Sequence, residues 1–155
     1  MLSVTVDQVL SWEPCEEYTR ARIEELFAGR ETINVHDVLE MNIPDEDKLW
    51  AVLREEFIPA GILHEFACWV AAIALHKERE SGREPDERSW EAIEVKWCWI
   101  NGRATDSELA TARATAWAGA AAGAGAAGAA AGAAAEAAAE AEQIKILKEL
   151  LEQKA

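Results

Sequence analysis

The sequence from Ala116 to Ala135 reads AWAGAAAGAGAAGAAAGAAA, and this run decides the expected fold class. Trp117 is its only residue that is neither alanine nor glycine, and no charge occurs between Arg113 and Glu136. Such a segment has no polar face, so as a helix it needs close contact with other helices. We therefore expect an all-α protein, a compact helical bundle in which this helix packs among tryptophan-bearing helices.

The glycines of the run favour close helix packing. A glycine inside a helix costs about 1 kcal/mol relative to alanine, and packing must offset that cost. Glycines four residues apart let two helix backbones approach closely. The positions expected to make these contacts are Trp117, Gly119, Gly123, Gly128 and Gly132. A flexible linker and a membrane span are the alternatives, although the run contains no serine and alanine gains little on transfer to lipid.

The helical pattern continues beyond the run. It begins at a capping box, Thr105-Asp106-Ser107-Glu108, and extends to Gln153. One continuous rod of that length would measure on the order of 70 Å. The alternative is a helical hairpin that breaks near Gly123-Ala124-Gly125. The last segment, Glu136 to Gln153, is amphipathic, and its apolar side carries Ile144, Leu147, Leu150 and Leu151.

Helix signals also fill the preceding part of the chain. Capping residues, first-turn prolines and apolar residues at helical spacing predict each helix. The expected helices are Thr5 to Gln8, Glu16 to Phe27, Val35 to Met41, Pro44 to Phe57, Gly61 to Glu80 and Asp86 to Asn101. We expect one domain over residues 1–155: acidic helices in 1–60, tryptophan-rich core helices in 61–104, and the Ala/Gly-rich and amphipathic helices in 105–155.

The seven tryptophans are many for 155 residues. The segment Gly61 to Glu80 is the most hydrophobic ordinary helix, so we expect it to be central. Tryptophans on apolar stripes are expected in the core, namely Trp50, Trp69, Trp90 and Trp97. Trp12, Trp99 and Trp117 fit the stripes less well and are candidates for a protein interface, and we expect Trp117 to contact another helix.

The net charge of −14 is concentrated near the N-terminus, where residues 1–60 carry fourteen acidic against five basic side chains. This charge argues against direct binding of nucleic acid and favours a basic protein partner. Adjacent helical residues point about 100° apart, so paired acids do not form catalytic dyads. They form either a solvated face or a partner-binding surface that competes with nucleic acid for a basic protein, as DNA mimics do. The residues of such a surface would be Glu16, Glu17, Glu24, Glu25, Asp45, Glu46, Asp47, Glu55 and Glu56.

Reactive and metal-binding residues form no complete signature. His64 and Cys68 have the four-residue spacing of metal ligands on a helix, but no second pair accompanies them. We read them as a core thiol beside a partly exposed histidine, and we expect no metal, no cofactor and no catalytic residues. The chain has three cysteines, an odd number, and no two of them have the spacing of metal ligands. This pattern is typical of reduced thiols in a cytoplasmic protein. The N-terminus lacks the basic and apolar regions of a signal peptide.

Several short segments together resemble one known family. They are Lys48 to Glu56, Phe66-Ala67-Cys68, Pro85 with Ala92-Ile93-Glu94, Gly102, Thr105 to Ala110, and Ala114-Thr115-Ala116-Trp117. In these segments the chain is similar to immunity proteins of the immunity-5-like type, which occur in bacterial, prophage and phage genomes. The resemblance implies binding and inhibition of another protein, with no catalytic residues. Family members usually place Arg or Asp along the alanine helix where this chain has glycine, which implies a different partner surface.

Three hypotheses about function follow. The first is a non-enzymatic, cytoplasmic binding protein, either an immunity protein or a phage-encoded anti-defence inhibitor, whose acidic N-terminal third meets a basic toxin, host or defence protein. The second is a structural module that forms a homo-oligomer through its small-residue helix. The third is an enzyme of unrecognised type, with Cys68 or Cys98 as nucleophile. The sequence favours the first.

Overall fold

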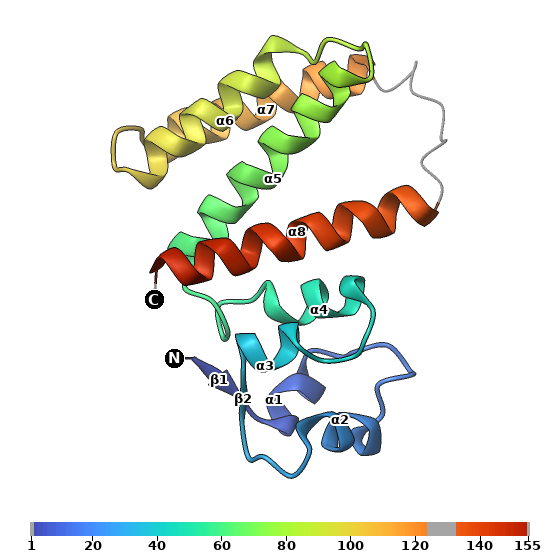
Figure 1. The fold of residues 1–155 in the computed structure, drawn as a ribbon. Helices are drawn as coiled ribbons and strands as arrows, with labels where there is room; N and C mark the ends of the chain where they lie inside the picture. Colours follow the sequence, from blue (N-terminus) through green and yellow to red (C-terminus); the bar gives the residue numbers. More distant parts are fainter. Residues whose placement is uncertain (1, 124–132, 155) are drawn as a thin grey trace.

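The computed structural model describes the backbone of residues 2–123 and 133–154 and the side chains of residues 2–118 and 138–154 (Figure 1). Helices contain 69% of the residues and strands 3%, which confirms the all-α prediction. The elements in chain order are β1 (Ser3–Val4), α1 (Val6–Ser11), α2 (Arg20–Phe27), β2 (Ile33–Asn34), α3 (Val35–Leu39), α4 (Asp45–Val52), α5 (Ala60–Glu80), α6 (Glu87–Ile100), α7 (Asp106–Gly123) and α8 (Ala133–Lys154).

Side-chain caps fix the starts of the N-terminal helices. Thr5 and Gln8 form a capping box at α1, and Asn34 with Asp37 forms another at α3. The hydroxyl of Thr19 accepts a hydrogen bond from the backbone N–H of Arg22, so α2 begins at residue 20. The predicted start at residue 16 is therefore wrong, and residues 12–19 form a loop between α1 and α2.

Two further differences from prediction occur near the N-terminus. A short antiparallel pairing joins β1 to β2, with Val4 opposite Ile33. Helix α4 ends at Val52, five residues before the predicted end at Phe57, because Leu53 leaves helical geometry with ψ at 55°. The chain then makes a turn in which Phe57 is buried.

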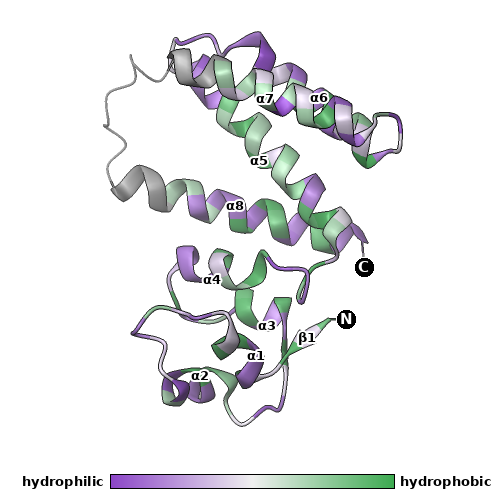
Figure 2. Cartoon of the chain, turned by 180° about the vertical axis from the view of Figure 1, so that it is seen from behind, coloured by the Kyte–Doolittle hydropathy of each residue, from purple (hydrophilic) through white to green (hydrophobic). Residues whose placement is uncertain are grey.

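The main core joins the N-terminal elements to the end of the chain. Helix α8 lies across α4 and the beginning of α5, and hydrophobic residues gather where these helices meet (Figures 1 and 2). The predicted stripe of α8 is confirmed, because Ile144, Leu147, Leu150 and Leu151 are all buried. The other buried core residues are Val4, Ile23, Phe27, Ile33, Val35, Val38, Leu39, Leu49, Val52, Phe57, Ile58 and Phe66.

Ion pairs border the contact of α8 with the rest of the core. Lys148 lies 2.6 Å from Glu40, and Lys154 lies 2.9 Å from Glu65. The pair of Lys148 with Glu40 thus connects α8 to the residue that follows α3. Exposed pairs of this kind contribute little stability, so the buried stripe holds α8 in place.

The second part of the fold is a layer of three helices. Helix α5 rises out of the core, and α6 and α7 pack beside it and against each other (Figure 1). Burial here is slight: α6 has no buried residue, and only Phe66 and Cys68 of α5 and Leu109 of α7 are buried among the described side chains. The prediction of a central α5 therefore holds only for its N-terminal half.

The tryptophans follow this uneven burial. Trp50 is 41% exposed and Trp69 is 48% exposed, so the prediction that they are core residues is wrong. Trp69 instead meets Trp97 edge to face, with ring centroids 6.0 Å apart. Trp90 and Trp97 are half-buried. Trp117 is 79% exposed, so none of the described helices covers its ring, and its contact with another helix stays a prediction.

The Ala/Gly-rich segment does not form one rod with the C-terminal helix. Helix α7 lies along α6, whereas α8 lies against α4 and α5. Helix α7 is described as far as Gly123, and the other two residues of the predicted break, Ala124 and Gly125, lie outside the described residues. Gly119 and Gly123 lie in α7, while Gly128 and Gly132 lie outside the described residues.

Candidate binding site

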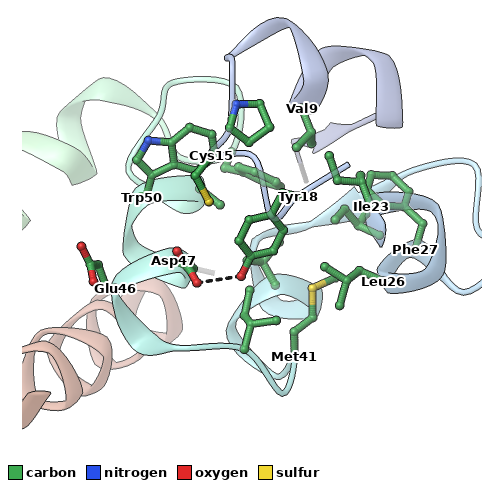
Figure 3. Close-up of a pocket in the computed structure, with 16 residues that line it drawn as sticks. Val9, Cys15, Tyr18, Ile23, Leu26, Phe27, Met41, Glu46, Asp47 and Trp50 are labelled. Carbon is green, nitrogen blue, oxygen red and sulfur yellow. Dashed lines mark hydrogen bonds between the residues drawn. The ribbon is translucent and has the colours of Figure 1, made fainter. Parts of the chain in front are cut away.

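An apolar cavity of about 310 Å³ lies in the acidic N-terminal third, among α1, α2, α3 and α4 (Figure 3). Its volume falls in the range of small-molecule and anchor-residue sites. Its lining residues are Val9, Pro14, Cys15, Tyr18, Ile23, Leu26, Phe27, Ile33, Val38, Met41, Ile43, Glu46, Asp47, Trp50, Ala51 and Phe57. None of these lining residues is a Lys, Arg or His, and the carboxylic acids among them are Glu46 and Asp47.

The loop over residues 12–19 forms one wall of the cavity. Glu13 adopts a positive φ of 54°, which turns the chain after α1, and Pro14 cannot continue a helix. The loop thereby brings Cys15 and Tyr18 over the cavity (Figure 3). The predicted helix from Glu16 to Phe27 would have included Tyr18 among its apolar residues, whereas the structure places Tyr18 in the loop.

A hydrogen bond fastens this loop to α4. The Tyr18 hydroxyl donates to Oδ2 of Asp47 at 2.7 Å, and the two side chains face each other in Figure 3. Asp47 lies in the first turn of α4, where a negative charge is favourable. Lys48 and Asp45, 2.9 Å apart, form a further contact within that turn.

The environment keeps the phenol neutral. Burial raises the pKa of Tyr18 well above its ordinary value, and the hydrogen bond to Asp47 and the charge of that carboxylate raise it further. A phenol of this kind remains a hydrogen-bond donor and does not act as a base near neutral pH. The cavity is therefore suited to binding, with a fixed donor–acceptor pair at its polar end.

The predicted acidic residues divide into groups. Exposed Glu16 and Glu17 lie between the lining residues Cys15 and Tyr18, and the Asp45–Asp47 segment begins α4, so these two groups border the same cavity. Glu24 and Glu25 pair instead with arginines of α2, Arg20 at 3.7 Å and Arg22 at 2.6 Å. Glu55 and Glu56 follow the opposite end of α4.

A cluster of aromatic rings and one arginine stands beside the cavity. The guanidinium of Arg54 lies 4.6 Å from the ring centroids of both Trp12 and Trp50. Trp12 also meets Phe57 edge to face at 5.9 Å. Sequence reasoning missed this cluster because Trp12 is distant in the sequence from the segment 50–57, which supplies the other members.

The predicted pair of His64 and Cys68 lines a different hollow, between α5, α6 and α7. Burial lowers the pKa of His64 and raises the pKa of Cys68, so both are neutral near pH 7. A neutral buried thiol is a poor nucleophile. Within residues 2–123 and 133–154, no group of three or more metal-ligating side chains occurs.

Comparison of the chain with protein-family models, curated proteins and solved structures gives no match. The family resemblance in the sequence therefore remains a prediction. Across the described helices, none has both the length and the apolar character needed to cross a bilayer.

Proposed function

We propose that this chain is a non-enzymatic binding protein that captures a basic protein at its N-terminal third. The observation that carries the proposal is the cavity among α1–α4: an apolar interior, two carboxylates at its polar end, and no basic lining residue. An apolar or aromatic side chain of the partner would fill the cavity, and neighbouring Lys or Arg residues would meet the acidic rim.

Two physical effects support this assignment. Anchor residues that fill a desolvated pocket contribute most of the affinity in many interfaces. Charges around such a pocket steer the approach of an oppositely charged partner and set the salt dependence of its association. Glu16, Glu17 and Glu46 are exposed at the rim, and none of them has an ion-pair partner among the residues whose side chains the structure describes. A partner cation would therefore gain a contact there without displacing one.

The finer proposal is that the captured protein is inhibited, as in an immunity protein or a phage-encoded anti-defence inhibitor. It rests on the resemblance of Phe66-Ala67-Cys68 and of the Thr105 capping-box segment to immunity proteins of the immunity-5-like type. Such a protein would act in the cytoplasm of the bacterial or infected cell, and its target would be a basic toxin or a host or defence protein.

The test is a quantitative pull-down from a lysate of the organism that encodes the chain, at low and high salt. Wild type should retain a basic protein in stoichiometric amount at low salt and release it at high salt. Glu46→Lys reverses one rim charge, and Ala51→Phe fills the cavity, so both should reduce capture at least tenfold. Glu152→Lys makes the same charge change at the exposed end of α8 and is the matched control.

A partner that is retained equally by Glu46→Lys, Ala51→Phe and Glu152→Lys would overturn the proposal. Far-ultraviolet circular dichroism and thermal unfolding of each variant establish that the fold is intact. Because Glu46 is exposed, its substitution leaves the core unchanged and keeps the test valid even where Ala51→Phe disturbs packing.

Self-association is the second candidate function, favoured by the exposure of Trp69 and Trp117 on the three-helix layer. Sedimentation over a range of concentrations tests it. A concentration-dependent mass that Trp69→Ser or Gly123→Leu abolishes would favour an oligomerisation module, and a constant monomer mass would exclude one.

A further inference from the structure

A second hollow lies on the opposite part of the molecule, between α5, α6 and α7. It is an open groove of about 620 Å³. Much of its surface is alanine, so side chains end at Cβ and leave the groove unfilled; these residues are Ala67, Ala71, Ala74, Ala92 and Ala116. The proposed capture of a basic protein does not use this groove.

The groove has a polar end and an apolar end. Near the start of α5, the ring of His64 meets Trp99 of α6, with ring centroids 5.0 Å apart. Near the end of α5, the ring of His76 meets Trp90, with ring centroids 4.9 Å apart. The helices are therefore antiparallel. Lys96 consequently lies near His64 and Cys68, and Ser89 lies near Ala74 and Leu75 at the far end.

The two cations of this groove, Lys96 and Arg113, form no ion pair with any described carboxylate. Eleven of the fifteen Lys and Arg residues have a carboxylate oxygen within 4.0 Å. Within the described part of the chain, the four others are Arg54, Lys96, Arg103 and Arg113. Arg54 lies between two tryptophan rings, whereas Lys96 and Arg113 line the same groove.

This placement is unusual in a chain with twenty-nine acidic residues. The Lys96 ammonium lies over the ring of Trp99, 3.8 Å from its centroid, instead of beside a carboxylate. Burial lowers the pKa of Lys96, and the nearby charge of Arg113 also lowers it. A bound anion would relieve both effects, because it supplies the missing counter-charge to two neighbouring cations.

We propose that this groove binds a single-chain carboxylate amphiphile, with its carboxylate between Lys96 and Arg113 and its apolar chain over Ala71 and Ala74 toward Leu75. The distance from His64 to Leu75 along α5 is roughly 16 Å at 1.5 Å per residue, which suits a linear chain of moderate length. His64 is neutral near pH 7, so Lys96 and Arg113 are the two cations that the described lining offers to an anionic headgroup.

The test is isothermal titration of the full chain with dodecanoate below its micellar concentration. We expect one binding event per chain and little binding of dodecanol or dodecylammonium, which have the same chain length but no negative charge. Lys96→Met and Arg113→Met should each weaken dodecanoate binding at least tenfold. Arg103→Met removes another cation without a carboxylate partner, outside the groove, and should leave binding unchanged.

A groove-filling variant, Ala71→Leu, should also weaken dodecanoate binding, whereas Ala51→Phe at the N-terminal cavity should not. Equal affinity for dodecanol, or unchanged binding by Lys96→Met and Arg113→Met, would overturn the proposal. So would a concentration-dependent dimer that Ala71→Leu dissociates and dodecanoate does not affect, since a second copy would then occupy the groove. Arg113 is exposed, so its variant tests the site without disturbing the fold.

Discussion

The hydroxyl of Tyr18 donates a hydrogen bond of 2.7 Å to Asp47, and this bond joins the loop before α2 to the first turn of α4. The two residues are 29 positions apart in the sequence. Their contact closes the polar end of the cavity among α1–α4 and determines where the acidic rim lies. The rigidity of the candidate binding site therefore depends on it.

Replacing Tyr18 by Phe should lower the free energy of unfolding by about 1–3 kcal/mol, because it removes a hydrogen bond to a charged group. Denaturant unfolding of Tyr18→Phe, Asp47→Asn and the double variant measures the coupling between the two side chains. A coupling near zero would show that the bond is not formed in solution.

The ionisation of Tyr18 provides an independent check. The chain has one tyrosine, so the ultraviolet absorbance of phenolate reports on this residue alone. Folding raises the pKa of Tyr18 above its ordinary value of 10.0. The contribution of protonated Tyr18 to the free energy of unfolding is therefore fully present below about pH 10. It is lost as the pH rises through the pKa of Tyr18 in the folded chain. The native chain should titrate at higher pH than the urea-unfolded chain, and coincident curves would contradict the buried environment.

The docking of α8 depends on Leu147, which is fully buried. Leu147→Ala should lower the free energy of unfolding by about 2–5 kcal/mol, because it removes core contacts and leaves a cavity. Ile146→Ala, at the neighbouring half-buried position, is the matched control and should have a smaller effect. Equal losses for the two variants would mean that α8 packs through a different face.

The exposure of Trp117 also has a measurable consequence. At 79% exposed, its side chain adds little to the stability of an isolated chain, so Trp117→Ser should change the free energy of unfolding by less than about 0.5 kcal/mol. Denaturant unfolding at low protein concentration measures this change. A large loss would indicate that the ring packs on a partner copy even at that concentration.

Local sequence signals predicted the helices well where a cap or an amphipathic stripe determined them. The helix starts after Thr5 and Asn34 and the buried stripe of α8 are examples, although α1 extends to Ser11, beyond its predicted end at Gln8. The start of α2 was missed because Thr19, the residue that caps it, is not followed by the acidic partner of a capping box. The pairing of Val4 with Ile33 was missed because two-residue strands carry no periodicity.

The periodicity of apolar residues in the sequence could not predict the cavity or the exposure of the tryptophans. An apolar stripe predicts that a helix face is covered, but it does not say how completely. Among the described elements the stripe of α6 packs mainly on α5 and α7, and Trp90 and Trp97 remain half-buried while Trp69 is exposed. The cavity depends on the distant contact of Tyr18 with Asp47, which no local pattern indicates.

The most direct test of the proposed function uses the cysteine positions. Cys15 is exposed and lines the cavity among α1–α4, whereas Cys98 lies on α6. A photo-crosslinker attached to Cys15 in a Cys98→Ser chain should capture a basic protein from the lysate at low salt and lose it at high salt. The same crosslinker on Cys98 in a Cys15→Ser chain should not capture that protein. Equal capture from both positions, or recovery of only a second copy of the chain, would contradict binding at the acidic-rimmed cavity.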